Sequence, residues 1–177
     1  MCIRDRLKDM LTRLGQDLGM GEVARGVAAD TPWRPGARQL LVELGEAGVP
    51  CALVTMSHAP LAQTLLDVAP AGVLELAVTG DEVFRGKPDP EAYTLALSRL
   101  RARHRHLDPA RCVVVEDSPV GVRAAMAAGL TTIGVPSVLP LDPDAATARW
   151  DTLAGRTAAD LAAVLPDAAV RSAADSS

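Results

Sequence analysis

Hydrophobic and polar positions follow two alternating patterns along this chain. Apolar residues that recur every three or four positions predict amphipathic helices, and short uninterrupted apolar runs predict buried strands. The helical pattern covers residues 7–18, 37–48, 57–68, 91–105, 118–129 and 157–165. The strand pattern covers residues 50–55, 73–79, 111–117 and 131–136. Gly48 and Gly129 close two of these helices, as glycines commonly do.

The order of the elements predicts the fold class. Strands that are apolar on both faces and alternate with helices indicate a parallel sheet with helices on both sides. A length of 177 residues suits one domain, or one domain with an appendage. The sequence therefore predicts an α/β fold, and ligands of such a sheet bind beyond the carboxyl ends of its strands.

Composition narrows the class of protein further. Apolar residues make up 49% and charged residues 23%, which allows a sizeable core. The net charge of −4 argues against a general binder of nucleic acid or anionic membranes. No apolar run approaches the ~18 residues of a membrane span, and the charged opening MCIRDRLKDM does not suit a secretory signal. We therefore expect a cytoplasmic protein that binds a small molecule, with no protein partner implied.

The cysteines and the basic residues are interpreted as mainly structural. Cys2, Cys51 and Cys112 are odd in number and widely spaced, so they fit neither a disulfide framework nor a CxxC metal site. Cys51 and Cys112 lie in apolar runs and are expected to be small core residues. The RLRARHRH run over residues 99–106 could bind phosphate, but the solvated end of a helix is favoured, because positive charge there complements the helix dipole.

Polar residues follow the predicted strands at the edge where a ligand would bind. Thr55 ends one strand, Glu116 and Asp117 end another, and Lys87 lies in the loop after residues 73–79. Each has an ordinary explanation by itself: a strand end, a solvated lysine, or a helix cap by Asp117 or Ser118. Together, a hydroxyl, an ammonium and two carboxylates suit a phosphoryl group with a divalent cation.

Three stretches carry a resemblance to a known family. LVTMS, GKPDP and VVVEDSPVGVRAAMAAG are similar to the second, third and fourth motifs of haloacid-dehalogenase-superfamily hydrolases. The branch that they resemble most is that of phosphoglycolate phosphatase and β-phosphoglucomutase. The resemblance runs from about residue 33 to residue 136. It implies a Rossmann-like core and Mg²⁺-dependent phosphoryl transfer on a small phosphorylated metabolite.

The resemblance also implies roles for particular residues. Thr55 and Lys87 correspond to the catalytic hydroxyl and lysine, and Asp117 and Glu116 to the acidic pair beside Mg²⁺, with Asp117 the surer direct ligand and Glu116 acting directly or through water. The implied phosphate-binding set is Thr55, Met56, Ser57 and Lys87. For Ser57, and for the nearby His58 and Asp81, a structural role is favoured. Ser118 and Gly121 are expected to shape the turn into the following helix.

The chain departs from the family at the first motif. The family nucleophile belongs to an hhhhDxDGT motif on an N-terminal strand, and no DxD precedes Thr55 here. We interpret residues 1–31 as the remnant of a helical cap, with MCIRDR as a non-native start, residues 32–168 as the hydrolase core and residues 169–177 as a disordered tail. The missing strand of the family is central, between the strands at 50–55 and 111–117. We therefore predict that the chain is a fragment, inactive and prone to unfold or aggregate.

Two classes of function remain open. The first is a phosphatase or phosphomutase that is active at full length through an aspartyl-phosphate. The second is a non-catalytic domain that binds metal and phosphate. A signalling receiver is disfavoured because its acidic pair comes first along the chain, and a dinucleotide-binding fold because no GxGxxG follows a strand.

Overall fold

The computed structural model describes residues 33–166. The predicted helix over residues 7–18, the cap remnant at 1–31 and the tail at 169–177 lie outside the described residues. Every helix predicted within the described range is present. They are α3 (Ala37–Glu46), α4 (Ala59–Val68), α5 (Glu91–Arg103), α6 (Pro119–Ala127) and α7 (Ala158–Ala163).

The predicted strands are present as well, each slightly shorter than its apolar run. They are β1 (Cys51–Val54), β2 (Leu74–Val78), β3 (Val113–Glu116) and β4 (Thr131–Gly134). Three short elements were not predicted: β5 (Ala148–Arg149) and the 3₁₀ turns η1 (Gly80–Glu82) and η2 (Pro109–Arg111). They are too short to carry a periodic pattern.

The strands form two parallel sheets instead of one. β1 pairs with β2, and β3 pairs with β4, which pairs with β5. No strand of residues 33–166 lies between β1 and β3, where the family resemblance places a central strand. The α/β class and the parallel pairing are confirmed, and within the described part of the chain the two sheets are separate at the position where a strand was expected to be missing.

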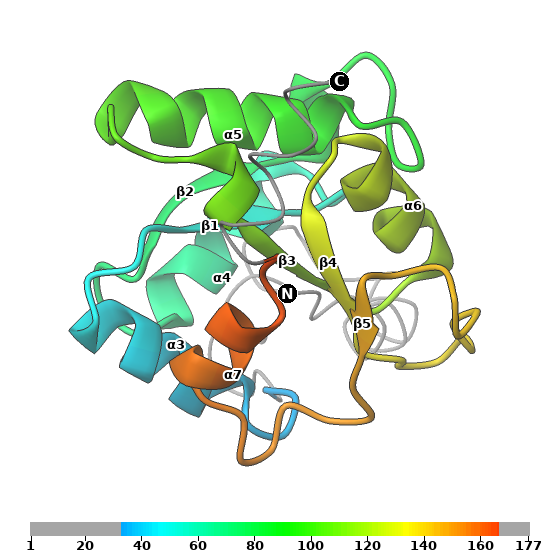
Figure 1. Ribbon diagram of the computed structural model, residues 1–177. Helices are drawn as coiled ribbons and strands as arrows, with labels where there is room; N and C mark the ends of the chain where they lie inside the picture. The colour runs from blue at the N-terminus through cyan, green and yellow to red at the C-terminus, as the bar shows by residue number, and fades with distance from the viewer. Residues whose placement is uncertain (1–32, 167–177) are drawn as a thin grey trace, which may run out of the picture.

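Helices cover both faces of the two sheets (Figure 1). On one face, α5 and α6 pack on Val54 of β1 and Val114 of β3. On the other face, α4 packs on Leu53 of β1, while α3 and α7 pack with Val113 and Val115 of β3. Alternate residues of β3 thus face opposite layers, which explains why the whole strand is apolar.

A cavity of about 960 Å³ lies between the two sheets. β1 and β3 line it together with α3, α5 and α7, and its lining is predominantly apolar. Cys51 and Cys112, expected to be small core residues, are partly buried and both line this cavity, and Cys112 also packs against the core cluster around Tyr93. Burial still raises the pKa of Cys51, to about 11, and raises that of Cys112.

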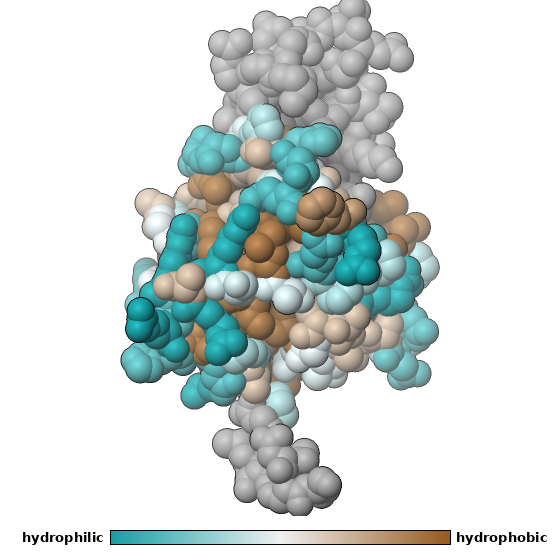
Figure 2. Space-filling model, turned by 90° about the horizontal axis from the view of Figure 1, so that it is seen from above, coloured by the Kyte–Doolittle hydropathy of each residue, from teal (hydrophilic) through white to brown (hydrophobic). Residues whose placement is uncertain are grey.

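The outer surface of the described part is mixed. Seen from above, hydrophilic residues form most of the surface, and hydrophobic residues are visible between them toward the middle (Figure 2). None of the helices in residues 33–166 has the length and apolar character needed to cross a bilayer.

Candidate active site

The carboxyl ends of β1 and β3 meet around the side chain of Lys87. Its ammonium donates to the Val54 carbonyl at 3.1 Å, at the end of β1, and forms an ion pair with Glu116, at the end of β3. The Lys87 and Glu116 side chains are only 3% and 2% exposed. Lysine and carboxylate, 29 positions apart in the sequence, therefore share one rim of the sheet, as predicted.

The loop that carries Lys87 is tied to the start of α5. The Glu91 carboxylate accepts hydrogen bonds from the backbone N–H groups of Phe84 and Arg85, each at 2.9 Å. Asp89 accepts from the backbone N–H of Glu91 at 3.0 Å. A charged group in a loop needs such anchoring, because the loop could otherwise turn the ammonium toward water.

Tyr93 is a member of this cluster that the sequence did not point to. Its hydroxyl donates to Glu116 and accepts from the Lys87 ammonium at 3.0 Å, and the ammonium lies 4.8 Å from the centre of its ring. Tyr93 is 4% exposed, on the first turn of α5. Its pattern in the sequence is that of a core residue, and only the packing of α5 beside β3 turns its hydroxyl into a polar contact.

These contacts determine the charge of Glu116. Burial by itself would raise the pKa of the carboxyl, but the Lys87 ammonium and the hydrogen bonds from Lys87 and Tyr93 outweigh it, so the pKa lies below its usual value. Glu116 is thus a carboxylate held by an ammonium and a phenol. Its counter-charge is the Lys87 ammonium.

Asp117 follows directly and is also buried, at 3% exposed. Its backbone N–H donates to Glu116 Oε2 at 3.2 Å, and the Ser118 hydroxyl donates to the same atom at 3.3 Å. Ser118 also caps α6 by accepting from the N–H of Gly121 at 3.1 Å, so its predicted capping role is confirmed.

Gly121 is required by the close approach of Glu116. A Cβ added at position 121 would lie 2.0 Å from Glu116 Oε2. Gly121 therefore lets α6 begin directly against the carboxylate that pairs with Lys87. This steric requirement explains why the fourth motif has a glycine at this position.

Thr55 directly follows β1, and both its backbone and its hydroxyl are hydrogen-bonded. Its N–H donates to the Val78 carbonyl at 2.9 Å, and its hydroxyl oxygen accepts from the N–H of Ser57 at 3.1 Å. A hydroxyl that accepts in this way keeps its own proton for another acceptor. Ser57 thus orients Thr55 through its backbone, which matches the structural role favoured for it.

Met56 and Ser57 are fixed against the loop after β2. Ser57 O accepts from the N–H of Gly80 at 3.1 Å, and a Cβ at position 80 would lie 2.5 Å from the Met56 carbonyl oxygen.

His58 is exposed at the N-cap of α4. Asp81 is exposed in η1, where a hydrogen bond from the Thr79 side chain lowers its pKa.

The acidic donors suit a hard cation with few protein ligands. Within residues 33–166 there is no cluster of three or more His, Cys, Asp or Glu side chains arranged to hold a metal. Mg²⁺ commonly takes one or two carboxylates and completes its shell with water and substrate phosphate. The two carboxylates of Glu116 and Asp117 match that smaller requirement in number and type, and Glu116 is also ion-paired with Lys87.

The basic run at the end of α5 packs on β2. Arg103 donates to the Glu75 carbonyl at 2.5 Å, and the His104 ring nitrogen lies 2.8 Å from the Glu75 carboxylate. Arg99 pairs with Glu82 at 2.7 Å. These side chains are 38–53% exposed, in keeping with a solvated helix end.

Comparison with known proteins agrees with this geometry. A family model of hydrolases, described as haloacid dehalogenase-like hydrolase, matches residues 3–129. Hexitol phosphatase A of Escherichia coli (strain K12) is 44% identical over 101 residues, which is 57% of this chain and 44% of that protein. The chain therefore spans less than half the length of this relative.

Solved structures resemble the fold closely. CbbY from Rhodobacter sphaeroides in complex with phosphate is 30% identical with a TM-score of 0.69, over 80% of this chain and 64% of that one. A mutant of the same protein was solved with xylulose-(1,5)bisphosphate. A protein from Thermotoga maritima assigned as a β-phosphoglucomutase is 31% identical with a TM-score of 0.61, over 83% of this chain and 66% of that one. The chain belongs to the haloacid dehalogenase-like hydrolases and fits their phosphatase and phosphomutase branch.

Proposed function

We propose that this chain forms the phosphate- and magnesium-binding part of a Mg²⁺-dependent phosphatase or phosphomutase. The observation that carries the proposal is the buried group of Lys87, Glu116 and Tyr93 at the carboxyl ends of β1 and β3. Glu116 directly precedes Asp117 in the sequence, and the Lys87 ammonium contacts the carbonyl of Val54, the residue before Thr55. A buried ion pair costs desolvation energy, so its presence at a ligand-binding rim favours function over stability alone.

Each residue has a distinct task in this proposal. The Thr55 hydroxyl, oriented by the N–H of Ser57, donates to a phosphoryl oxygen. The Lys87 ammonium offsets the negative charge that the phosphoryl group brings. Glu116 and Tyr93 hold that ammonium in place, and Asp117 is the carboxylate that would hold Mg²⁺. The bound cation would neutralise phosphoryl charge during transfer.

The proposed substrate is the phosphate ester of a small sugar or sugar alcohol. Hexitol phosphatase and the CbbY complexes with phosphate and xylulose-(1,5)bisphosphate support this class. The chain covers less than half of hexitol phosphatase A. We expect the complete enzyme to work through an aspartyl-phosphate.

The nucleophile decides between the two functional classes. Because no DxD precedes Thr55, we expect the 177-residue chain to bind without turnover, as a non-catalytic domain would. Hydrolysis of p-nitrophenyl phosphate that Asp117→Asn abolishes would overturn this expectation.

Calorimetry tests the binding itself. Titration of the chain with Mg²⁺ in the presence of inorganic phosphate is expected to give saturable binding. Asp117→Asn should remove Mg²⁺ binding. The control variant Asp151→Asn changes an exposed residue and should bind Mg²⁺ as the parent chain does. Equal binding by both variants would contradict the assignment of Asp117.

A further inference from the structure

The outer edge of β2 has no strand partner among residues 33–166, where β2 pairs only with β1. The Val78 carbonyl points toward β1, because it accepts from the N–H of Thr55 at 2.9 Å. Successive carbonyl groups alternate between the two edges of a strand, so the carbonyls of Glu75 and Ala77 point to the outer edge. Such an edge is a template for pairing with another chain unless something closes it.

Two arginines of α5 bind those outward carbonyls. Arg103 donates to the Glu75 carbonyl at 2.5 Å, and Arg99 donates to the Ala77 carbonyl at 3.3 Å. Four residues of a helix rise about 6 Å, and two residues of a strand span about 6.6 Å. Two arginines four positions apart on one helix face therefore match two alternate carbonyls of the strand beneath.

Acidic side chains hold the two guanidinium groups in position. Arg99 also pairs with Glu82, in η1, at 2.7 Å. Arg103 lies 4.0 Å from the Glu75 carboxylate, and the His104 ring nitrogen lies 2.8 Å from the same carboxylate. The last turn of α5 is thus fixed along β2 by contacts that also cover its outer edge.

We propose that Arg99 and Arg103 close the outer edge of β2 against pairing with a second copy of this chain. A second copy is the partner that fits, because two identical edges can pair antiparallel about a two-fold axis, each strand extending the other's sheet. The guanidinium groups occupy the acceptor sites that such pairing needs. Edge closure is independent of the proposed phosphoryl transfer, because it involves neither Lys87 nor the acidic pair.

Two double variants of the full 177-residue chain test this role. Arg99→Met/Arg103→Met removes both donors from the edge. Arg101→Met/Arg105→Met removes the same amount of charge from exposed positions beside them. Sedimentation velocity over a range of concentrations is expected to give an association constant at least about 10-fold higher for the first variant than for the second.

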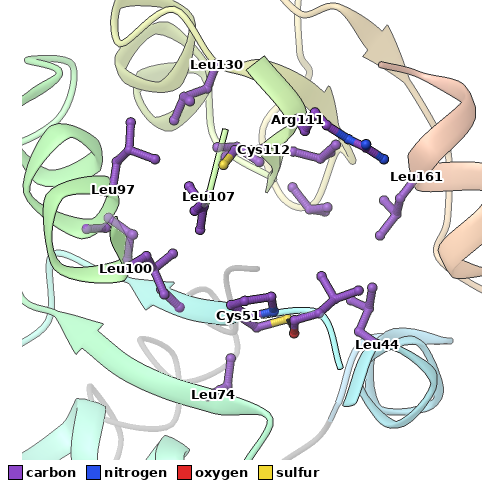
Figure 3. Close-up of a pocket in the computed structure, with 18 of the residues that line it drawn as sticks. Leu44, Cys51, Leu74, Leu97, Leu100, Leu107, Arg111, Cys112, Leu130 and Leu161 are labelled. Carbon is purple, nitrogen blue, oxygen red and sulfur yellow. Dashed lines mark hydrogen bonds between the residues drawn. The ribbon is translucent and has the colours of Figure 1, made fainter. Parts of the chain in front are cut away.

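The strands at the cavity provide the background of this measurement. Cys51 and Cys112 lie beside the facing edges of β1 and β3, on opposite sides of the cavity (Figure 3). Neither double variant changes these strands, and each removes one arginine that lines the cavity, Arg103 or Arg105. Association through the edges at the cavity therefore contributes to both variants alike.

Hydrogen exchange locates the contact. The N–H of Ala77 points to the same outer edge as its carbonyl. In Arg99→Met/Arg103→Met, exchange of this amide is expected to slow at least about 5-fold as rising protein concentration drives association. In Arg101→Met/Arg105→Met, it should not change with concentration.

Equal association constants for the two double variants would overturn the proposal. Stronger association without slower exchange at Ala77 would overturn it too, since the contact would then lie elsewhere. If circular dichroism shows that Arg99→Met/Arg103→Met does not fold, the single variants Arg103→Met and Arg101→Met are compared in the same way. The expected excess for Arg103→Met is then about 3-fold, and equality would again contradict edge closure.

Discussion

At the scale of single residues, Lys87 and Glu116 are the pair on which the site depends. Both side chains are almost completely buried, and a buried charge is tolerated only when it is paired and hydrogen-bonded. Glu116 satisfies this with Lys87, Tyr93 and the hydroxyl of Ser118. The chemistry of the rim is therefore also a matter of folding stability.

Replacing Lys87 tests this dependence. Lys87→Met is expected to destabilise the chain by about 3–5 kcal/mol, because it leaves the Glu116 carboxylate buried without its counter-charge. Arg99→Met removes the partly exposed ion pair with Glu82 and should cost about 0.2–1 kcal/mol. Urea unfolding, with the same osmolyte added to each variant, measures both. Similar losses for the two variants would show that burial gives the Lys87 pair no special weight.

The free energy of unfolding, measured as the pH falls from 7 to 3, tests the charge of Glu116. A carboxyl whose pKa is lowered by folding contributes stability above its unfolded pKa, near 4.5, and loses it as the pH falls through the lower folded value. Glu116→Gln should therefore destabilise most at neutral pH and progressively less below about pH 4.5. Unfolding measured from pH 7 to pH 3 gives this difference. A difference that does not change with pH would contradict a depressed pKa.

Tyr93→Phe offers a gentler change in the same cluster. The variant loses the hydroxyl that donates to Glu116 and accepts from Lys87, at an expected cost of about 1–3 kcal/mol. The pKa of Glu116 should rise toward its usual value, since one hydrogen bond that lowers it is gone. The pH-dependent part of stability should therefore shrink without disappearing. If Tyr93→Phe leaves the pH profile as in the parent chain, the hydroxyl has no influence on Glu116.

At the scale of elements, the start of α6 connects the helix to the site. Ser118 caps the helix, and Gly121 allows its first turn to lie against Glu116. The same few residues therefore stop β3, begin α6 and place two carboxylates at the rim. This is why the motif is compact in the sequence.

In Gly121→Ala, helix propensity and packing are expected to change the stability in opposite directions. Alanine favours a helix over glycine by about 1 kcal/mol, but the new Cβ would overlap the Glu116 carboxylate. We expect a net loss of about 1–3 kcal/mol. Arg123→Ala, on the exposed face of α6, should change stability by less than about 0.5 kcal/mol. A stabilised Gly121→Ala variant would mean that the close approach is easily relieved.

At the scale of the whole molecule, the dominant feature is the gap between β1 and β3 in the sheets that residues 33–166 form. The two sheets have helices on both faces (Figure 1), yet β1 and β3 enclose a cavity of about 960 Å³ where they do not meet. Unsatisfied backbone groups along two edges cost about 1–3 kcal/mol each when buried. A few of them approach the whole stability of an ordinary domain, about 5–15 kcal/mol.

The chain alone is therefore expected to be poorly stable and to self-associate through its open edges. Size-exclusion chromatography and thermal unfolding measure this, with concentration as the variable. A monomer that melts cooperatively with ordinary domain stability would contradict the prediction.

The sequence by itself determined the elements and the edge at which chemistry occurs. Apolar runs of strand length and helical spacing predicted β1 to β4 and α3 to α7, because both patterns are local and repeat within a few residues. The order of Thr55, Lys87 and Glu116 on these elements predicted that they would share one rim, because parallel strands end on the same side. The ion pair of Lys87 and Glu116, together with the hydrogen bond from Lys87 to the Val54 carbonyl, places Lys87 at the carboxyl ends of both β1 and β3.

Only the tertiary structure decided which partners these residues take. Tyr93 has the sequence pattern of a core position, and its hydroxyl enters the site only because α5 packs beside β3. Cys51 and Cys112 lie in apolar runs that indicate core residues, and both also line a cavity, because no strand of residues 33–166 lies between β1 and β3. The local sequence pattern shows only whether a position is apolar. Which side chain or strand lies beside that position depends on segments that are distant along the chain.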